Sequence, residues 1–159
     1  AVRLAQPYLQ RAAELEASEP VVAHYCRVHA LELLMRIRQS GKASPESNGL
    51  LLEVFEQAES KKQLLKQKFD LSRGPPVMRA FALRFFENAN AADLAGPASS
   101  SIPQQLYLAG LFLDVLAQFH GGELPPDLAE ASRYAKQRAV HVRGCLQRGL
   151  QPEPARPPA

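Results

Sequence analysis

A single carboxylate is the side chain best placed to do chemistry in this chain of 159 residues. Asp114 lies within an apolar stretch, 106–119, that is expected to be a buried helix. Burial favours the neutral form of a carboxyl group, which could then act as a general acid or base. A polar strip position or a salt bridge to a neighbouring helix is the more common explanation of such a residue, and we favour it.

The four histidines are not spaced as a metal site requires. His24 and His29 lie five residues apart, whereas two ligands on one helix face need a spacing of three or four. His120 falls beside Gly121 at an expected helix end, and His141 lies on a charged helix. Each is expected to be a surface or boundary residue rather than a ligand or a base.

The cysteines and the lack of catalytic motifs also argue against catalysis and metal binding. Cys26 and Cys145 both lie in apolar helical patterns, which favours two buried thiols over a disulfide or a metal pair. The sequence contains no P-loop, no dinucleotide-binding glycine motif and no nucleophile elbow. It therefore predicts a protein that is not an enzyme and uses no cofactor or metal.

The composition allows a folded core but carries no nucleic-acid signature. Apolar residues make up 46% of the chain, and 19 basic against 16 acidic residues leave a net charge of +3. Nucleic-acid binding would require a concentrated basic stripe. The one basic run, 61–68, is expected to be a solvated helix face or a contact for an acidic protein segment. Contact with phosphate or anionic lipid is the remaining interpretation.

Prolines and glycines divide the chain into six helical segments. Proline suits the first turn of a helix, because its φ is fixed and it has no N–H to donate. No segment alternates with the period of a half-buried strand, so we predict an all-α fold. The expected starts are Pro7, Pro20, Pro45, Pro75 with Pro76, Pro103, and Pro125 with Pro126, aided by caps at Ser44 and in the pair Ser101 and Gln104. The predicted helices are 4–17, 20–39, 45–69, 76–91, 102–120 and 126–148, with Gly41, Gly74, Gly96, Gly121, Gly122 and Gly149 at or beyond their ends.

Two of these segments, 20–39 and 102–120, are apolar nearly all round. Such helices must be covered by neighbours on several sides. This pattern predicts two three-helix units, 1–70 and 76–149, each small for an independent core and therefore expected to pack together. Residues 150–159 contain four prolines and predict the start of a Pro-rich linker rather than a folded segment.

The third helix is the candidate wall of a binding groove. Leu50, Leu51, Leu52, Val54 and Phe55 cannot all be buried, because consecutive residues of a helix point about 100° apart. Exposed apolar residues beside lysines would suit an amphipathic partner helix that carries leucines and acidic residues. The sequence has neither a signal peptide nor an apolar run long enough to cross a bilayer, so a cytosolic location is expected.

Three stretches together resemble one family. Residues 19–32 read E-P-V-V-A-H-Y-C-R-V-H-A-L-E, which resembles the D/E-P-L/V-V-A-Y-Y-C-R-L/V-Y-A signature of the Vps-twenty-associated family, also called the LYST-interacting protein family. Residues 81–96 resemble its F-A-L…F…A-D…D-R-A-G pattern, and residues 109–136 resemble a third pattern that ends in Y-A-K. The resemblance covers nearly the whole chain.

The resemblance implies a function in the ESCRT pathway. Members of that family carry a tandem of two MIT-like three-helix modules that binds C-terminal tails of ESCRT-III subunits in multivesicular body sorting. A Pro-rich linker and a C-terminal region then engage the AAA ATPase that disassembles ESCRT-III. The resemblance therefore implies a cytoplasmic interaction domain that is recruited to endosomes, with peripheral membrane association at most and no nucleic-acid partner.

The resemblance also implies binding residues. A groove between the second and third helices would take an amphipathic ESCRT-III helix, and the second module would bind another subunit. The chain departs from the family pattern at Leu94, where arginine is usual, and at Gln137, where an aromatic residue is common. The first-module residues would be Met35, Arg36, Leu51, Phe55, Ala58 and Lys62, and the second-module residues Tyr107, Tyr134, Gln137, Arg138 and His141. A membrane-surface adaptor that uses the basic run is the alternative function.

Overall fold

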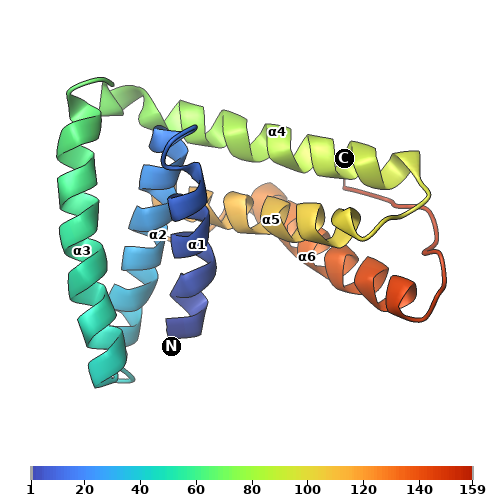
Figure 1. Ribbon diagram of the computed structural model, residues 1–159, viewed down its shortest axis with the longest axis horizontal. Coiled ribbons are helices and arrows are strands. Elements are labelled where there is room, and N and C mark those ends of the chain that lie inside the picture. The colour runs from blue at the N-terminus through green and yellow to red at the C-terminus, as the bar shows by residue number, and fades with distance from the viewer. Residues whose placement is uncertain (1, 159) are drawn as a thin grey trace. The chain divides into compact units, whose positions relative to one another are not determined.

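The computed structural model describes residues 2–158, and these residues form six α-helices and two short 3₁₀ helices (Figure 1). No strand occurs between residues 2 and 158, so the predicted all-α fold is confirmed. In chain order the elements are α1 (Val2–Leu15), α2 (Pro20–Gln39), α3 (Pro45–Lys66), η1 (Leu71–Arg73), α4 (Gly74–Ala95), α5 (Ser101–Val115), η2 (Leu116–Phe119) and α6 (Pro126–Gln147).

Prolines begin three of the six described α-helices at predicted positions. Pro20, Pro45 and Pro126 each occupy the first position of a helix, where the missing N–H costs no intrahelical bond. Ser44 caps α3 as predicted. Its hydroxyl accepts from the Ser47 amide at 3.0 Å, and the Ser47 hydroxyl accepts from the Ser44 amide at 2.8 Å.

Two predicted helix starts are wrong. Pro7 lies inside α1 rather than at its beginning. It lies beyond the first four amides of the helix, which have no intrahelical partner, so it removes one backbone hydrogen bond of the helix. The capping box of Ser101 and Gln104 does not form, because α5 begins one residue earlier and its N-cap is Ser100. Pro103 then occupies the third helical position, where it offers no N–H to a capping side chain.

The described residues divide into two compact units, residues 2–78 and residues 79–158. The start of α4 belongs to the first unit, although the sequence assigned the fourth helix wholly to the second. Gly74 explains the difference. It begins α4 with φ −66° instead of ending a helix, and a Cβ atom there would lie 1.9 Å from the Tyr25 hydroxyl oxygen. The identification of the units with MIT-like modules stays a prediction.

In the first unit, α2 lies between α1 and α3, and those two outer helices scarcely touch each other. Tyr8 of α1 packs its ring edge-on against His29 of α2, with centroids 4.4 Å apart. Arg27 of α2 is ion-paired with Glu16 in the turn after α1. The N-terminal part of α2 is buried on all sides, as its apolar pattern predicts, at Val21, Val22, Ala23, Tyr25, Cys26, Ala30 and Leu34.

In the second unit, α5 and α6 pack closely and α4 adds large side chains to their core. Phe81 and Phe85 of α4 each contact the ring of Phe112 on α5, with centroids 5.0 Å apart. Gly110 allows the close approach of α6, since a Cβ atom there would meet Lys136 at 2.8 Å. The buried cluster comprises Ala89, Ile102, Leu106, Ala109, Ala135, Ala139 and Val142.

The C-terminal segment differs from the expected linker. Residues 150–158 form no helix or strand, as their prolines predict. They nevertheless lie against the second unit, where Ala155 is buried and Gln151 is hydrogen-bonded to the Ala98 amide at 2.9 Å. Proline content predicts the lack of regular structure but says nothing about whether an extended chain is bound to a surface.

The packing of Gly74 against Tyr25 gives a stability prediction. We expect Gly74→Ala to lower the free energy of unfolding by about 1–3 kcal/mol, because the new methyl group overlaps the tyrosine ring. Gly49→Ala is the matched control. Gly49 lies in α3 with open space around its Cα, so alanine should leave stability unchanged or raise it by up to about 1 kcal/mol.

Urea unfolding followed by circular dichroism measures both variants. Equal midpoints for Gly74→Ala and Gly49→Ala would show that the Tyr25 ring does not constrain the start of α4.

Candidate protein-interaction grooves

A groove of about 530 Å³ runs between α2 and α3 in the first unit. The two helices are consecutive and joined by a short loop, so they run side by side in opposite directions (Figure 1). The α2 wall carries residues at helical spacings of three and four, which place them on one face. The lining residues are Leu31, Met35, Arg38 and Gln39 of α2 and Leu51, Leu52 and Phe55 of α3.

The groove exposes large apolar side chains to solvent. Met35, Leu52 and Phe55 are 44%, 62% and 50% exposed. Leu51 is buried at the base of the same groove. Adjacent exposed apolar groups of this size, bordered by polar residues, are typical of a protein-binding surface. The arrangement can hold a peptide by burying apolar side chains, and it offers no group for covalent chemistry.

The structure brings three of the six predicted first-module residues into this groove, namely Met35, Leu51 and Phe55. Ala58 is buried beneath the same stripe of α3, one turn further on. Arg36 and Lys62 do not line the groove. Arg38 is the basic residue there and was not among the predicted residues, although its spacing of three from Met35 on α2 was a usable signal.

Lys62 lies instead beside a buried histidine. His24 is 7% exposed, and burial together with the positive charges of Arg27 and Lys62 lowers its pKa from 6.5 to about 4. Glu16 and Glu59 act in the opposite direction on that pKa, and their effect is smaller. His24 is therefore neutral near pH 7.

A second groove, of about 770 Å³, lies between α5 and α6 in the second unit. Tyr107 of α5 and Val140 of α6 are 40% and 61% exposed there. Lys136 and Arg143 add positive charge to the α6 wall. Positions 136, 140 and 143 follow the helical spacing of four and three, so one face of α6 carries all three.

Asp114 has the structural role that the sequence favoured. Its carboxylate is ion-paired with Lys136 and accepts a hydrogen bond from the Ser132 hydroxyl at 2.6 Å. Both partners come from α6, so the group ties α5 to α6 beside the second groove.

The predicted second-module residues divide between two faces of the unit. Tyr107 lines the groove between α5 and α6, and Gln137 is exposed. Arg138 is buried and forms a bidentate pair with Asp93 of α4, with distances of 2.8 and 3.1 Å. Tyr134, Arg138 and His141 share another face of α6, and this face contacts the C-terminal segment.

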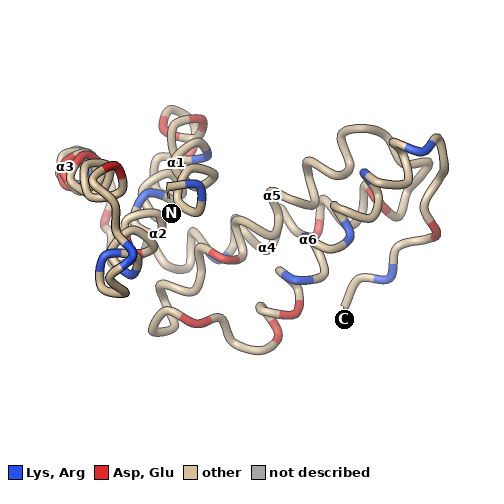
Figure 2. The backbone as a smooth tube through the Cα atoms, turned by 90° about the horizontal axis from the view of Figure 1, so that it is seen from below, with Lys and Arg blue, Asp and Glu red and all other residues tan. Residues whose placement is uncertain are grey.

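The cysteine and the possible metal ligands show no arrangement for chemistry among the described residues. Burial raises the pKa of the Cys26 thiol to about 12, which leaves it protonated and unreactive. Within residues 2–158, no three His, Cys, Asp or Glu side chains are grouped to hold a metal ion. The basic run 61–68 lies beside acidic residues. Lys61 lies 4.0 Å from the Glu16 carboxylate, and Figure 2 shows acidic and basic residues interspersed along the chain.

None of the helices described between residues 2 and 158 combines the length and the apolar character that crossing a bilayer requires.

Known proteins resemble this chain over most of its length. The family model described as "Vta1 like" matches residues 5–148. An Arabidopsis thaliana protein named "homolog of mammalian LYST-interacting protein 5" is 36% identical over 151 residues, which cover 95% of this chain and 34% of that protein. Two further relatives are each named "Vacuolar protein sorting-associated protein VTA1 homolog". That of Dictyostelium discoideum is 31% identical over 149 residues, covering 93% of this chain and 27% of that protein. That of Homo sapiens is 30% identical over 151 residues, covering 93% of this chain and 48% of that protein.

The neutral state of His24 predicts that stability depends on pH. Its folded pKa of about 4 lies below the unfolded value of 6.5, so the unfolded chain binds the proton more readily. Stability is fully present above pH 6.5 and is lost as the pH falls from 6.5 towards 4. Relative to His24→Phe, the wild-type chain should lose about 1–2 kcal/mol of unfolding free energy between pH 7.5 and pH 5.

Denaturant unfolding of both proteins at the two pH values tests this. Parallel pH profiles for wild type and His24→Phe would mean that His24 titrates alike in the folded and unfolded chains.

Proposed function

Because the chain belongs to the Vta1-like family, we propose that it is a protein-interaction domain that binds the C-terminal tails of ESCRT-III subunits in endosomal sorting. The names of its Dictyostelium and human relatives refer to vacuolar protein sorting, which supports a sorting role. The chain spans 27% to 48% of the length of the curated relatives described above. Regulation of the ESCRT-III-disassembling AAA ATPase is accordingly proposed for the longer protein, through sequence outside this chain.

The groove between α2 and α3 is the observation that carries this proposal. An amphipathic helix that lies in such a groove presents apolar residues at spacings of three and four. Met35, Leu52 and Phe55 supply the exposed apolar contacts for them. Arg38 lines the groove and provides a positive charge for an acidic residue of the tail. The apolar contacts supply most of the affinity, and the charge fixes the register of the bound helix.

The groove between α5 and α6 gives the second unit a comparable surface. Tyr107 and Val140 are exposed on its walls, and Lys136 and Arg143 make it basic. Because Lys136 is already paired with Asp114, Arg143 contributes more of the net positive charge. We propose that this groove binds a second ESCRT-III tail of the same amphipathic and acidic character.

Substitution of Phe55 tests the first groove. We expect Phe55→Asp to weaken the binding of ESCRT-III tail peptides at least tenfold, which is about 1.4 kcal/mol, because it places a carboxylate among the apolar contacts. Leu64→Asp is the matched control, since Leu64 is an equally exposed apolar residue of α3 at 57% and does not line the groove. It should leave the affinity within about twofold.

Titration calorimetry against a panel of ESCRT-III tails measures both variants, and circular dichroism verifies that each remains helical. Lys62→Asp should have a smaller effect than Phe55→Asp, because Lys62 lies beside His24 rather than in the groove. The proposal fails if no tail in the panel distinguishes Phe55→Asp from Leu64→Asp.

A further inference from the structure

The C-terminal segment, residues 150–158, lies on the second unit as a strap held by specific polar contacts. The Gln151 side chain accepts from the Ala98 amide at 2.9 Å. The backbone carbonyl of Glu153 accepts a hydrogen bond from Arg138 at 2.9 Å. The side-chain carboxylate of Glu153 lies 2.8 Å from Nε2 of His141. The Ala155 methyl group is buried, at 8% exposed. The segment therefore has a defined position along α6.

The surface that holds the strap is fixed by contacts between α4 and α6 that do not involve the strap. Arg138 and Asp93 form a buried pair, with side chains 8% and 1% exposed. Asp93 accepts from Nε and from Nη2 of Arg138, and the same Nη2 also donates to the Glu153 carbonyl. A guanidinium fixed in this way presents the second Nη2 proton at a set position, which suits a backbone carbonyl of any extended chain.

The strap leaves part of this surface unfilled. Pro157 and Pro158 line one end of a hollow of about 320 Å³ between α4 and α6, whose floor includes Leu83, Phe86 and Leu128. The side-chain oxygen of Asn90, which also lines the hollow, is buried and has no hydrogen-bond partner among the described residues. An unpaired buried oxygen costs free energy, so a ligand that donates to it would gain over the strap.

The ion pair that the strap makes with α6 is weak. The Glu153 and His141 side chains are 70% and 41% exposed, and exposed ion pairs contribute little to binding. The strap is also tethered to the end of α6, which gives it an effective concentration on the order of millimolar.

From these contacts we propose that the face formed by α4 and α6 is a docking site for an extended, proline-containing peptide segment of a partner protein. The strap occupies this site in cis, and the partner must displace it. The strap identifies the class of ligand. It supplies a carbonyl to Arg138, a carboxylate to His141 and a small side chain at the Ala155 position. This site differs from the two helix grooves, and the proposal does not depend on ESCRT-III binding.

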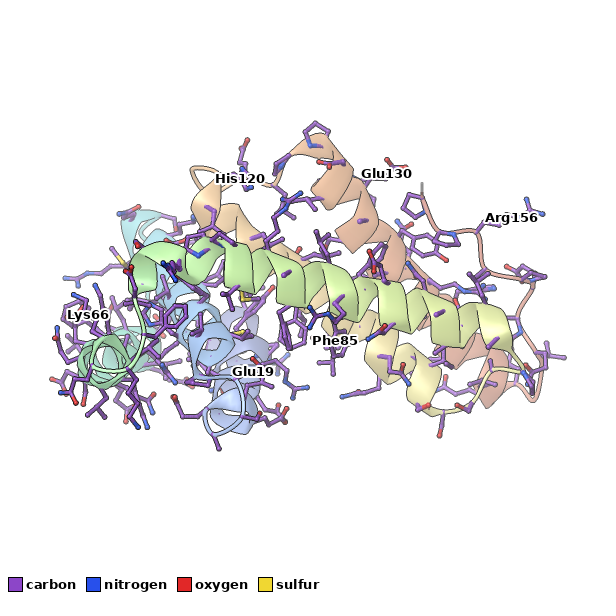
Figure 3. The ribbon with its side chains drawn as sticks, turned by 90° about the horizontal axis from the view of Figure 1, so that it is seen from above. Glu19, Lys66, Phe85, His120, Glu130 and Arg156 are labelled. Carbon is purple, nitrogen blue, oxygen red and sulfur yellow. The ribbon has the colours of Figure 1, made fainter. Side chains whose placement is uncertain are left out.

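The test opens the strap in the whole chain without altering the surface beneath it. The variant carries Gln151→Ala, Glu153→Ala and Ala155→Arg, all within the strap. Its matched control is Arg156→Gln, whose side chain is exposed on the outer side of the strap (Figure 3). In ¹H–¹⁵N NMR spectra we expect the amide signals of Ala98, Arg138 and His141 to shift in the opened variant and to stay in place in the control.

A synthetic peptide with the sequence of residues 150–158 is then the probe. We expect it to bind the opened variant with a dissociation constant near 1 mM and to return the three signals towards their wild-type positions. It should bind the wild-type and Arg156→Gln chains about twofold more weakly, because their own straps compete with it at an effective concentration on the order of millimolar.

Two results would overturn the proposal. The first is equal binding, or no binding, of the peptide by the opened and wild-type chains. The second is loss of the folded spectrum in the opened variant, which would make the strap a structural part of the second unit. Neither result concerns the binding of ESCRT-III tails by the helix grooves.

Discussion

The incomplete covering of α2 is the constraint on which the first unit depends. α2 has 20 residues and α1 has 14, so α1 is about 9 Å shorter at 1.5 Å per residue. The residues of α2 from Val21 to Leu34 are buried or half-buried, whereas most of its last turn is exposed. One helix therefore satisfies two requirements along its length. Its first part closes the core, and its end stays open beside α3 and forms the wall that carries Met35 and Arg38.

The second unit depends on a buried ion pair instead. Removing Asp93 and Arg138 from water is costly, and the cost is offset only when both groups are hydrogen-bonded well. The bidentate geometry gives both groups good hydrogen bonds, and it orients the guanidinium so that Nη2 also donates to the strap. The departure from the family pattern at the next residue, Leu94, has no such consequence, because its side chain is 58% exposed. Gln137 is likewise exposed, so the fold does not depend on either departure.

Local rules of sequence predicted the helices better than they predicted tertiary contacts. Proline at the first helical position and the Ser44 cap depend only on neighbouring backbone groups, and both were predicted correctly. Pro7 and Ser101 show the limit of these rules, since the helix was extended beyond the expected start in each case. The crowding of apolar residues on α3 indicated a groove wall, and the resemblance to the family singled out Phe55 on it. The roles of Gly74 and of the strap could not be predicted, because each depends on a surface formed by residues distant in sequence.

The position of α4 in the chain has a consequence for how the protein can be divided. The boundary between the two units falls between Met78 and Arg79, inside a helix of 22 residues. A cut at that boundary would break the consecutive backbone hydrogen bonds of the helix and leave unpaired amide and carbonyl groups at both new ends. It would also leave the fully buried Met78 side chain at a fraying terminus. The two units are thus distinct in their packing but joined covalently in a way that does not allow them to be exchanged as separate modules.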